Sequence, residues 1–200
     1  QSLSVATVGA AGNFAGTTNA LDTSATTGKT VDVKVSTGNL TLTNDVTTNT
    51  TGTVYLTAVT GITQATAGTP KITTGTLGML VTGTGDIDVN NANLVSTLGA
   101  KTANGGVKYT NDQSLSVATV GAAGNFAGTT NALDTSATTG KTVDVKVSTG
   151  NLTLTNDVTT NTTGTVYLTA VTGITQATAG TPKITTGTLG LLVTGTGDID

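Results

Sequence analysis

The sequence predicts an all-β fold, a parallel β-helix solenoid, from three observations: an internal repeat, short apolar runs of period two, and few aromatic residues. Residues 113–200 repeat residues 1–88 at an offset of 112, and the one mismatch places Met79 opposite Leu191. Met and Leu have similar volumes, so a packed interior tolerates this exchange. The repetition predicts stacked units that each contact their neighbours.

This repeat also sets the expected domain organisation. Residues 1–112 form repeat unit 1, and residues 113–200 form an incomplete repeat unit 2. We expect the two units to make one continuous solenoid and to be a fragment of a longer array. The sequence in this window holds no candidate membrane-spanning segment.

Alternation of apolar and polar residues predicts the strands. In residues 31–36 the three valines share one face, while Asp32, Lys34 and Ser36 share the other. The same alternation recurs in residues 3–5, 39–44, 53–57, 77–81, 87–89 and 107–109. No long stretch has the spacing of an amphipathic helix, and Thr, about a quarter of all residues, favours strands.

The alternation also predicts the interior side chains, among them Val33, Leu42 and Ile87. Two architectures can hold such strands: a coil of parallel strands, or tandem antiparallel β-sandwich domains of about this unit size. Sandwich cores usually contain large aromatic side chains, whereas this chain has five aromatic residues in all. They are Phe14, Tyr55, Tyr109, Phe126 and Tyr167. This scarcity favours the solenoid and leaves the sandwich as the alternative.

Composition narrows the possible functions. The chain has no Cys, His, Trp, Arg or Glu, so it offers no thiolate, no imidazole base and no ordinary zinc site. With a net charge of −3 and eight dispersed Lys, the sequence predicts no basic patch of the kind that binds nucleic acid. We therefore expect no enzyme activity, with no catalytic, cofactor-binding or metal-binding residue.

Asp86 and Asp88 are the strongest candidates for chemistry. Their Gly- and Asp-rich context faintly resembles calcium-binding nonapeptide loops, yet it is not repeated every nine residues as that binding mode requires. A glycosidase would need one of a carboxyl pair in an apolar cleft, whereas both Asp are predicted on a solvated strand face. The preferred interpretation is a turn followed by a strand.

Thr-x-Thr pairs suggest a second candidate surface. The pairs in unit 1 are Thr41 and Thr43, Thr51 and Thr53, Thr74 and Thr76, and Thr82 and Thr84. Some ice-binding β-solenoids align such pairs on a flat face, which requires a constant spacing. The spacings between the first Thr of successive pairs are 10, 23 and 8 residues. We interpret these Thr mainly as strand formers.

Two minor patterns have simple interpretations. Asn39, Asn49, Asn151 and Asn161 fit the N-glycosylation acceptor pattern, which chance produces often in a chain so rich in Asn and Thr. Lys34 and Asp32 are expected to form a surface ion pair of little energetic value.

Four segments carry a resemblance to a known family: GNLTLTND at 38–45, GTVYLTAVTGITQATAG at 52–68, GTLGMLVTGTGDIDVNN at 75–91, and GGVKYTNDQSLSVATV at 105–120. Together they resemble the repeat region of filamentous-haemagglutinin-like exoproteins, the surface adhesins of Gram-negative bacteria. The resemblance implies a right-handed parallel β-helix of about twenty residues per coil, secreted and displayed on the bacterial cell surface as a long rod.

The expected function is therefore structural: a fibre or adhesin stalk for attachment, cell contact or biofilm. Its expected partners are copies of itself or adjacent repeats stacked end to end, and a host or matrix glycan or protein receptor. A ligand-binding solenoid for ice or glycan, using Thr-rich faces, is the alternative. Coils of about twenty residues predict five or six coils and an advance of roughly 24–29 Å per unit.

Overall fold

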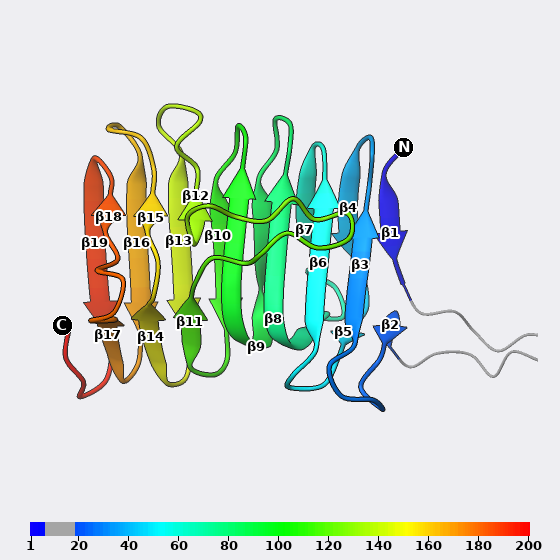
Figure 1. The fold of residues 1–200 in the computed structure, drawn as a ribbon, viewed down its shortest axis with the longest axis horizontal. Coiled ribbons are helices and arrows are strands. Elements are labelled where there is room, and N and C mark those ends of the chain that lie inside the picture. The colour runs from blue at the N-terminus through cyan, green and yellow to red at the C-terminus, as the bar shows by residue number, and fades with distance from the viewer. Residues whose placement is uncertain (7–18) are drawn as a thin grey trace, which may run out of the picture.

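A computed structural model of the chain describes residues 1–6 and 19–200, and Phe14 lies outside the described residues (Figure 1). This part of the chain contains strands, turns and no helix. Its strands are β1 (Leu3–Val5), β2 (Leu21–Asp22), β3 (Thr30–Lys34), β4 (Asn39–Leu42), β5 (Val46–Thr47), β6 (Thr53–Ala58), β7 (Gly61–Gln64), β8 (Ile72–Val81), β9 (Ile87–Thr102), β10 (Val107–Asn111), β11 (Leu115–Val117), β12 (Leu133–Asp134), β13 (Thr142–Val147), β14 (Asn151–Leu154), β15 (Val158–Thr159), β16 (Thr165–Ala170), β17 (Gly173–Gln176), β18 (Ile184–Thr185) and β19 (Thr188–Val193).

The strands stack as a β-solenoid of about eight turns, which confirms the predicted fold class. Every pairing between the named strands is parallel, and the strands run across the long axis of the rod (Figure 1). The alternative of tandem antiparallel β-sandwich domains is wrong, because such domains pair neighbouring strands in opposite directions. A single antiparallel bridge, between Ala123 and Phe126, lies outside the named strands of the described chain.

Two strand stacks form the main faces of the rod. The first face contains β3, β6, residues 76–81 of β8, residues 97–102 of β9, β11, β14 and β17. The second face contains β1, β4, β7, residues 87–89 of β9, β10, β13, β16 and β19. The long strand β9 rounds a corner and contributes to both faces.

The 112-residue repeat corresponds to four and a half turns. Leu3 begins a second-face row that passes through four further turns to Val107. Its repeat equivalent, Leu115, lies half a turn later, on the first face, where it pairs with Leu152. Consequently β3 stacks on the first face, whereas its equivalent β13 stacks on the second face. Successive units are thus rotated by half a turn.

The expectation of five or six coils per unit is therefore wrong. In most turns the register offset lies between 18 residues, from Asn93 to Asn111, and 26 residues, from Val46 to Ile72. The offset from Leu115 to Leu152 is 37 residues, because this turn includes a long excursion at 118–132. With strands about 4.8 Å apart, four and a half turns advance the axis by about 22 Å.

Alternate side chains fill the interior as predicted. Leu42 and Ile87 are buried among stacked aliphatic side chains of neighbouring turns. Val33 packs against the same core but is only half-buried, because β3 pairs with β6 alone among the described strands. Its equivalent Val145 is fully buried, since β13 lies between β10 and β16.

Candidate functional site

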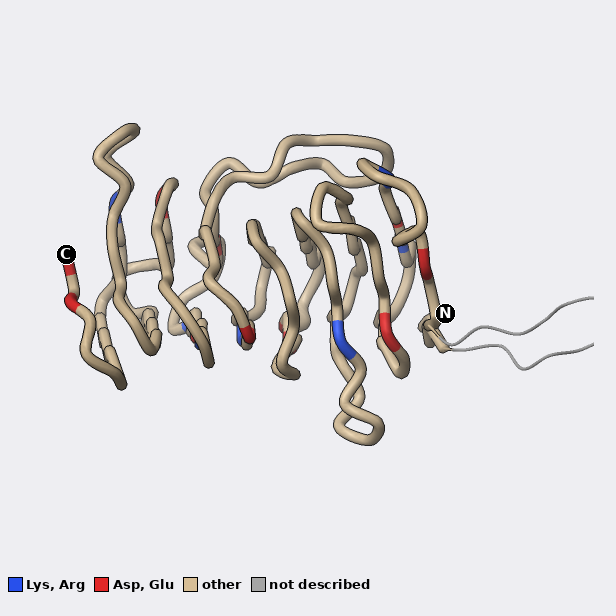
Figure 2. The backbone as a smooth tube through the Cα atoms, turned by 90° about the horizontal axis from the view of Figure 1, so that it is seen from below, with Lys and Arg blue, Asp and Glu red and all other residues tan. Residues whose placement is uncertain are grey.

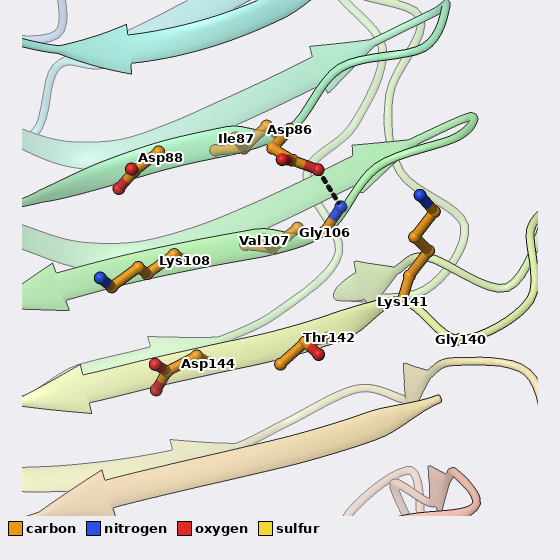
Figure 3. A pocket seen from close by; sticks show the side chains of 10 residues that line it. All are labelled: Asp86, Ile87, Asp88, Gly106, Val107, Lys108, Gly140, Lys141, Thr142 and Asp144. Atoms are coloured by element: carbon orange, nitrogen blue, oxygen red, sulfur yellow. Dashed lines mark hydrogen bonds between the residues drawn. The ribbon is translucent and has the colours of Figure 1, made fainter. Parts of the chain in front are cut away.

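A surface hollow lies on the second face, over β9, β10 and β13 (Figure 3). It is lined by Asp86, Ile87, Asp88, Gly106, Val107, Lys108, Gly140, Lys141, Thr142 and Asp144. The hollow therefore brings both sequence-predicted carboxylates together with two Lys and a third Asp that sequence reasoning did not single out.

Asp86 has a structural partner in this hollow. Its Oδ1 accepts a hydrogen bond from the backbone N–H of Gly106 at 2.7 Å, which ties two successive turns together (Figure 3). A Cβ on the adjacent Gly105 would lie 2.0 Å from the carbonyl oxygen of Gly85, so the two turns approach closely only with glycine there. Asp86 thus fastens a loop, a contact that the sequence did not predict, and β9 begins at the next residue, as expected of a turn followed by a strand.

Opposite charges alternate across the neighbouring strands β9, β10 and β13 of the hollow. Lys108 is the register neighbour of Asp88 on one side and of Asp144 on the other. Lys101 and Asp134, at 3.5 Å, form the one ion pair in the described chain, so the Lys108 ammonium lies beyond ion-pair distance of both the Asp88 and the Asp144 carboxylates. Asp86 and Asp88 are exposed rather than enclosed by apolar side chains. The described residues hold no group of three or more potential metal ligands of the His, Cys, Asp and Glu types.

The four Thr-x-Thr pairs do not share one surface. Thr41 lies on the second face beside Thr63, with their hydroxyl oxygens 3.2 Å apart, whereas Thr74 is buried and donates to the carbonyl oxygen of Gly52. Thr82 lies beyond the end of β8. A different row does align, and it comprises Thr30, Thr53, Thr76, Thr97, Ser116, Thr153 and Thr175 across the first face.

Asn side chains of the acceptor pattern make local hydrogen bonds. Asn49 Oδ1 accepts from the backbone N–H and the hydroxyl of Thr51, both at 2.9 Å. Asn161 repeats this arrangement with Thr163. Asn39 accepts from the hydroxyl of Thr60, and Asn151 has the equivalent bond with Thr172. These Asn thus shape turns and strand ends.

The expected ion pair between Lys34 and Asp32 is wrong. Asp32 Oδ2 instead accepts hydrogen bonds from Asn125, from the backbone N–H at 2.7 Å and from Nδ2 at 3.2 Å. Lys34 and Asp32 are two residues apart on one strand face, a separation of about 7 Å, and the carboxylate is drawn toward Asn125.

Asn125 belongs to a feature that sequence reasoning missed, the segment 118–132 between β11 and β12, here called the arm. The arm leaves β11 in unit 2, runs back over the first face to β3 in unit 1, and returns to β12 (Figure 1). Hydrogen bonds between Ala123 and Phe126 close its tip, and Thr129 N–H donates to Val120 O. It is a narrow hairpin laid along the rod.

Phe126 fills a groove under the arm. Its ring stacks on Tyr55 with centroids 5.0 Å apart and an angle of 17° between the ring planes. It packs with Leu80 and Val120 in a small apolar cluster separate from the main core. A Cβ on Gly78 would lie 2.8 Å from the Phe126 ring, so the glycine makes the floor of the groove. The contact needs this particular set of residues on β6 and β8.

Two buried Asn side chains tie the corner between the faces. Asn93 Oδ1 accepts from Ile72 N–H at 2.8 Å and from Gln64 Nε2 at 2.7 Å. Asn111, its register neighbour, bonds to both the N–H and the carbonyl of Val95. These side chains replace backbone pairing where the strands bend. Sequence reasoning missed both residues, although Asn111 lies two residues after the interior Tyr109 and therefore on the buried face of β10.

Charged residues are spread along the rod, with no concentration on one side (Figure 2). No helix in the described part of the chain is long and apolar enough to span a membrane. Comparisons with protein-family models, with curated proteins and with solved structures found no match to this chain. The fold and site define the class of protein: a β-solenoid in which an arm from one repeat packs on the repeat before it.

Proposed function

We propose that this chain is a structural module of a bacterial cell-surface fibre or adhesin stalk, secreted to give a rigid, extended rod. The observation that carries this proposal is the continuity of the two units. β10 of unit 1 pairs with β13 of unit 2 over five residues in register, and β9 pairs with β11 and β12. No hinge separates the units, so adding units lengthens one stiff body.

The candidate hollow supports this role better than catalysis. Asp86 is engaged in a backbone contact, and Asp88, Lys108 and Asp144 form an exposed row of alternating charge. Such a row places opposite charges next to each other on neighbouring turns of a repetitive surface. It offers no enclosed acid and base, which a hydrolase of this shape would need.

Two experiments test the two parts of the proposal. For the rod, electron micrographs of arrays with two, four and six units should show straight particles that lengthen by about 22 Å per unit. Flexible chains of beads would contradict it. For location, antibodies against the chain should label rods outside the cells that produce it. Label found only within the cells would reject the surface role.

The ligand-binding alternative has one observation in its favour, the row of seven hydroxyl residues on the first face. The row is spaced by the strand separation of about 4.8 Å. However, the arm stands over the adjacent row, where it covers Tyr55 and Gly78, so the face is not flat. A single row beside a ridge suits a narrow glycan chain better than an ice surface. Thermal hysteresis without glycan binding would reverse this preference.

A further inference from the structure

The groove that the arm of unit 2 fills in unit 1 has an unfilled counterpart in unit 2. In unit 1, Phe126 is 1% exposed and Leu80 is 8% exposed. In unit 2, the equivalents of Tyr55 and Leu80 are Tyr167 and Leu192, which are 48% and 55% exposed. Leu192 lies on β19, which pairs with β16 alone, whereas Tyr167 lies on β16 with a paired strand on each side, and a tyrosine ring left this open on a rod surface indicates a contact site.

The unfilled groove in unit 2 has the same residues as the filled groove in unit 1. Each of its four main residues is repeated, with Asp144 for Asp32, Tyr167 for Tyr55, Gly190 for Gly78 and Leu192 for Leu80. A Cβ on Gly190 would lie 2.7 Å from Tyr167 Cδ1, and a Cβ on Gly78 would lie 3.0 Å from Tyr55 Cδ1. The tyrosine therefore leans over the glycine in both units, with or without an arm above it.

The segment that occupies the filled groove is itself part of the repeat, because the arm sequence is present in the chain twice. Residues 118–130 and residues 6–18 are both ATVGAAGNFAGTT. The contact in unit 1 shows how this sequence binds: Asn125 to a carboxylate, and Phe126 on a tyrosine ring. No charged side chain is present in the arm, so its recognition depends on ring stacking, apolar burial and that carboxylate.

We infer that the groove of Asp144, Tyr167, Gly190 and Leu192 binds the arm of a following repeat of the same sequence. In the filled groove, β9 lies between β8 and β11, so one turn separates Leu80 from the strand that carries the arm. For the same spacing on unit 2, one turn must lie between β19 and the strand that carries the next arm. The sequence of residues 89–112, which follows the equivalent position in unit 1, supplies that turn. Each repeat then clasps the repeat before it. This inference concerns the joining of repeats and does not depend on location at a cell surface.

A single thiol reports on the groove, because the natural chain has no cysteine. The substitution Leu192→Cys is made in three proteins: the 200-residue chain, a chain extended after Asp200 by a copy of residues 89–132, and the same extension with its arm replaced by a short Gly-Ser turn. Reaction of the thiol with an aromatic disulfide reagent is followed in each. Leu80→Cys in the 200-residue chain gives the rate for a thiol beneath an arm.

In the extension with an arm, the Leu192→Cys thiol should react about tenfold or more slowly than in the other two proteins, close to the Leu80→Cys rate. Equal reaction rates of the Leu192→Cys thiol in all three proteins would overturn the inference, because the added arm would then leave the groove open. Equal slowing by both extensions would also overturn it, because the added turn alone would then cover the groove.

Discussion

Phe126 in unit 2 stacks on Tyr55 in unit 1, with ring centroids 5.0 Å apart, although the two residues lie three turns apart in the solenoid. The stack fixes the tip region of the arm over the groove, and it joins two units that also share backbone pairing. A contact of this kind adds stability without lengthening the rod, and it can be removed without opening the main core.

Phe126→Ala should destabilise the arm by about 3 kcal/mol, because it removes a buried ring from its apolar cluster and leaves a cavity. In a double-mutant cycle with Tyr55→Ala, we expect a coupling energy of about 0.5–1.5 kcal/mol for the ring pair. Chemical denaturation provides the measurement. Tyr167→Ala is the matched control and should cost less than about 0.5 kcal/mol in this chain. Equal effects of the Tyr55 and Tyr167 substitutions would contradict the stacking role.

Asp32→Ala should loosen the arm tip, because Asn125 loses both of its hydrogen bonds to the carboxylate. We expect amide hydrogen exchange at Asn125 to accelerate by about tenfold or more, equivalent to about 1.4 kcal/mol. The matched change Asp144→Ala removes the repeat-equivalent carboxylate, where no arm is bound in this chain. If it accelerated exchange at Asn125 equally, the assignment of Asp32 as the anchor would fail.

Asn111→Ala should be among the most damaging polar substitutions. It leaves the buried N–H and carbonyl of Val95 without their side-chain partner, at a cost of about 1–3 kcal/mol for each group. The loss should appear in the urea midpoint and in exchange of the Val95 amide. Asn90→Ala removes an exposed Asn that accepts one bond from Thr110, so it should change stability by less than about 1 kcal/mol. Comparable losses would show that the corner does not depend on Asn111.

The buried Tyr109 phenol should make the folded chain less stable at alkaline pH. Burial raises the pKa of its phenol well above the usual value of 10, because the charged form is desolvated. The folded chain therefore keeps a proton that the unfolded chain loses. Stability should be complete below about pH 10 and should fall above it, by about 1.4 kcal/mol for each pH unit. Tyr109→Phe should remove that part of the slope in pH-dependent denaturation, and Tyr167→Phe should retain it. An unchanged slope in Tyr109→Phe would refute the assignment.

The local pattern of the sequence was sufficient to predict the strands and most of the core. The side-chain alternation in residues 39–44 is a property of neighbouring residues, and Leu40 and Leu42 are buried as it indicates. The same reasoning correctly kept Asp86 and Asp88 on the exposed surface.

Contacts between distant turns were not predictable in this way. Whether Asn125 meets Asp32 depends on how many residues each intervening turn contains, and the offsets vary between 18 and 37 residues without a local signal. A uniform coil of twenty residues gave the wrong number of turns and hid the half-turn between units. The arm contains small residues and one Phe, and such a composition resembles an ordinary loop until its groove is known.

The half-turn between units has a mechanical consequence. An arm thickens one side of the solenoid only, and a structure reinforced on one side tends to curve. Because the next unit is turned to the opposite side, the curvature that one unit introduces is reversed by the following unit. The bends cancel over two units, about 43 Å of axis at the usual strand separation. A long array of this sequence should therefore run straight, whereas a repeat of whole turns would wind into an arc.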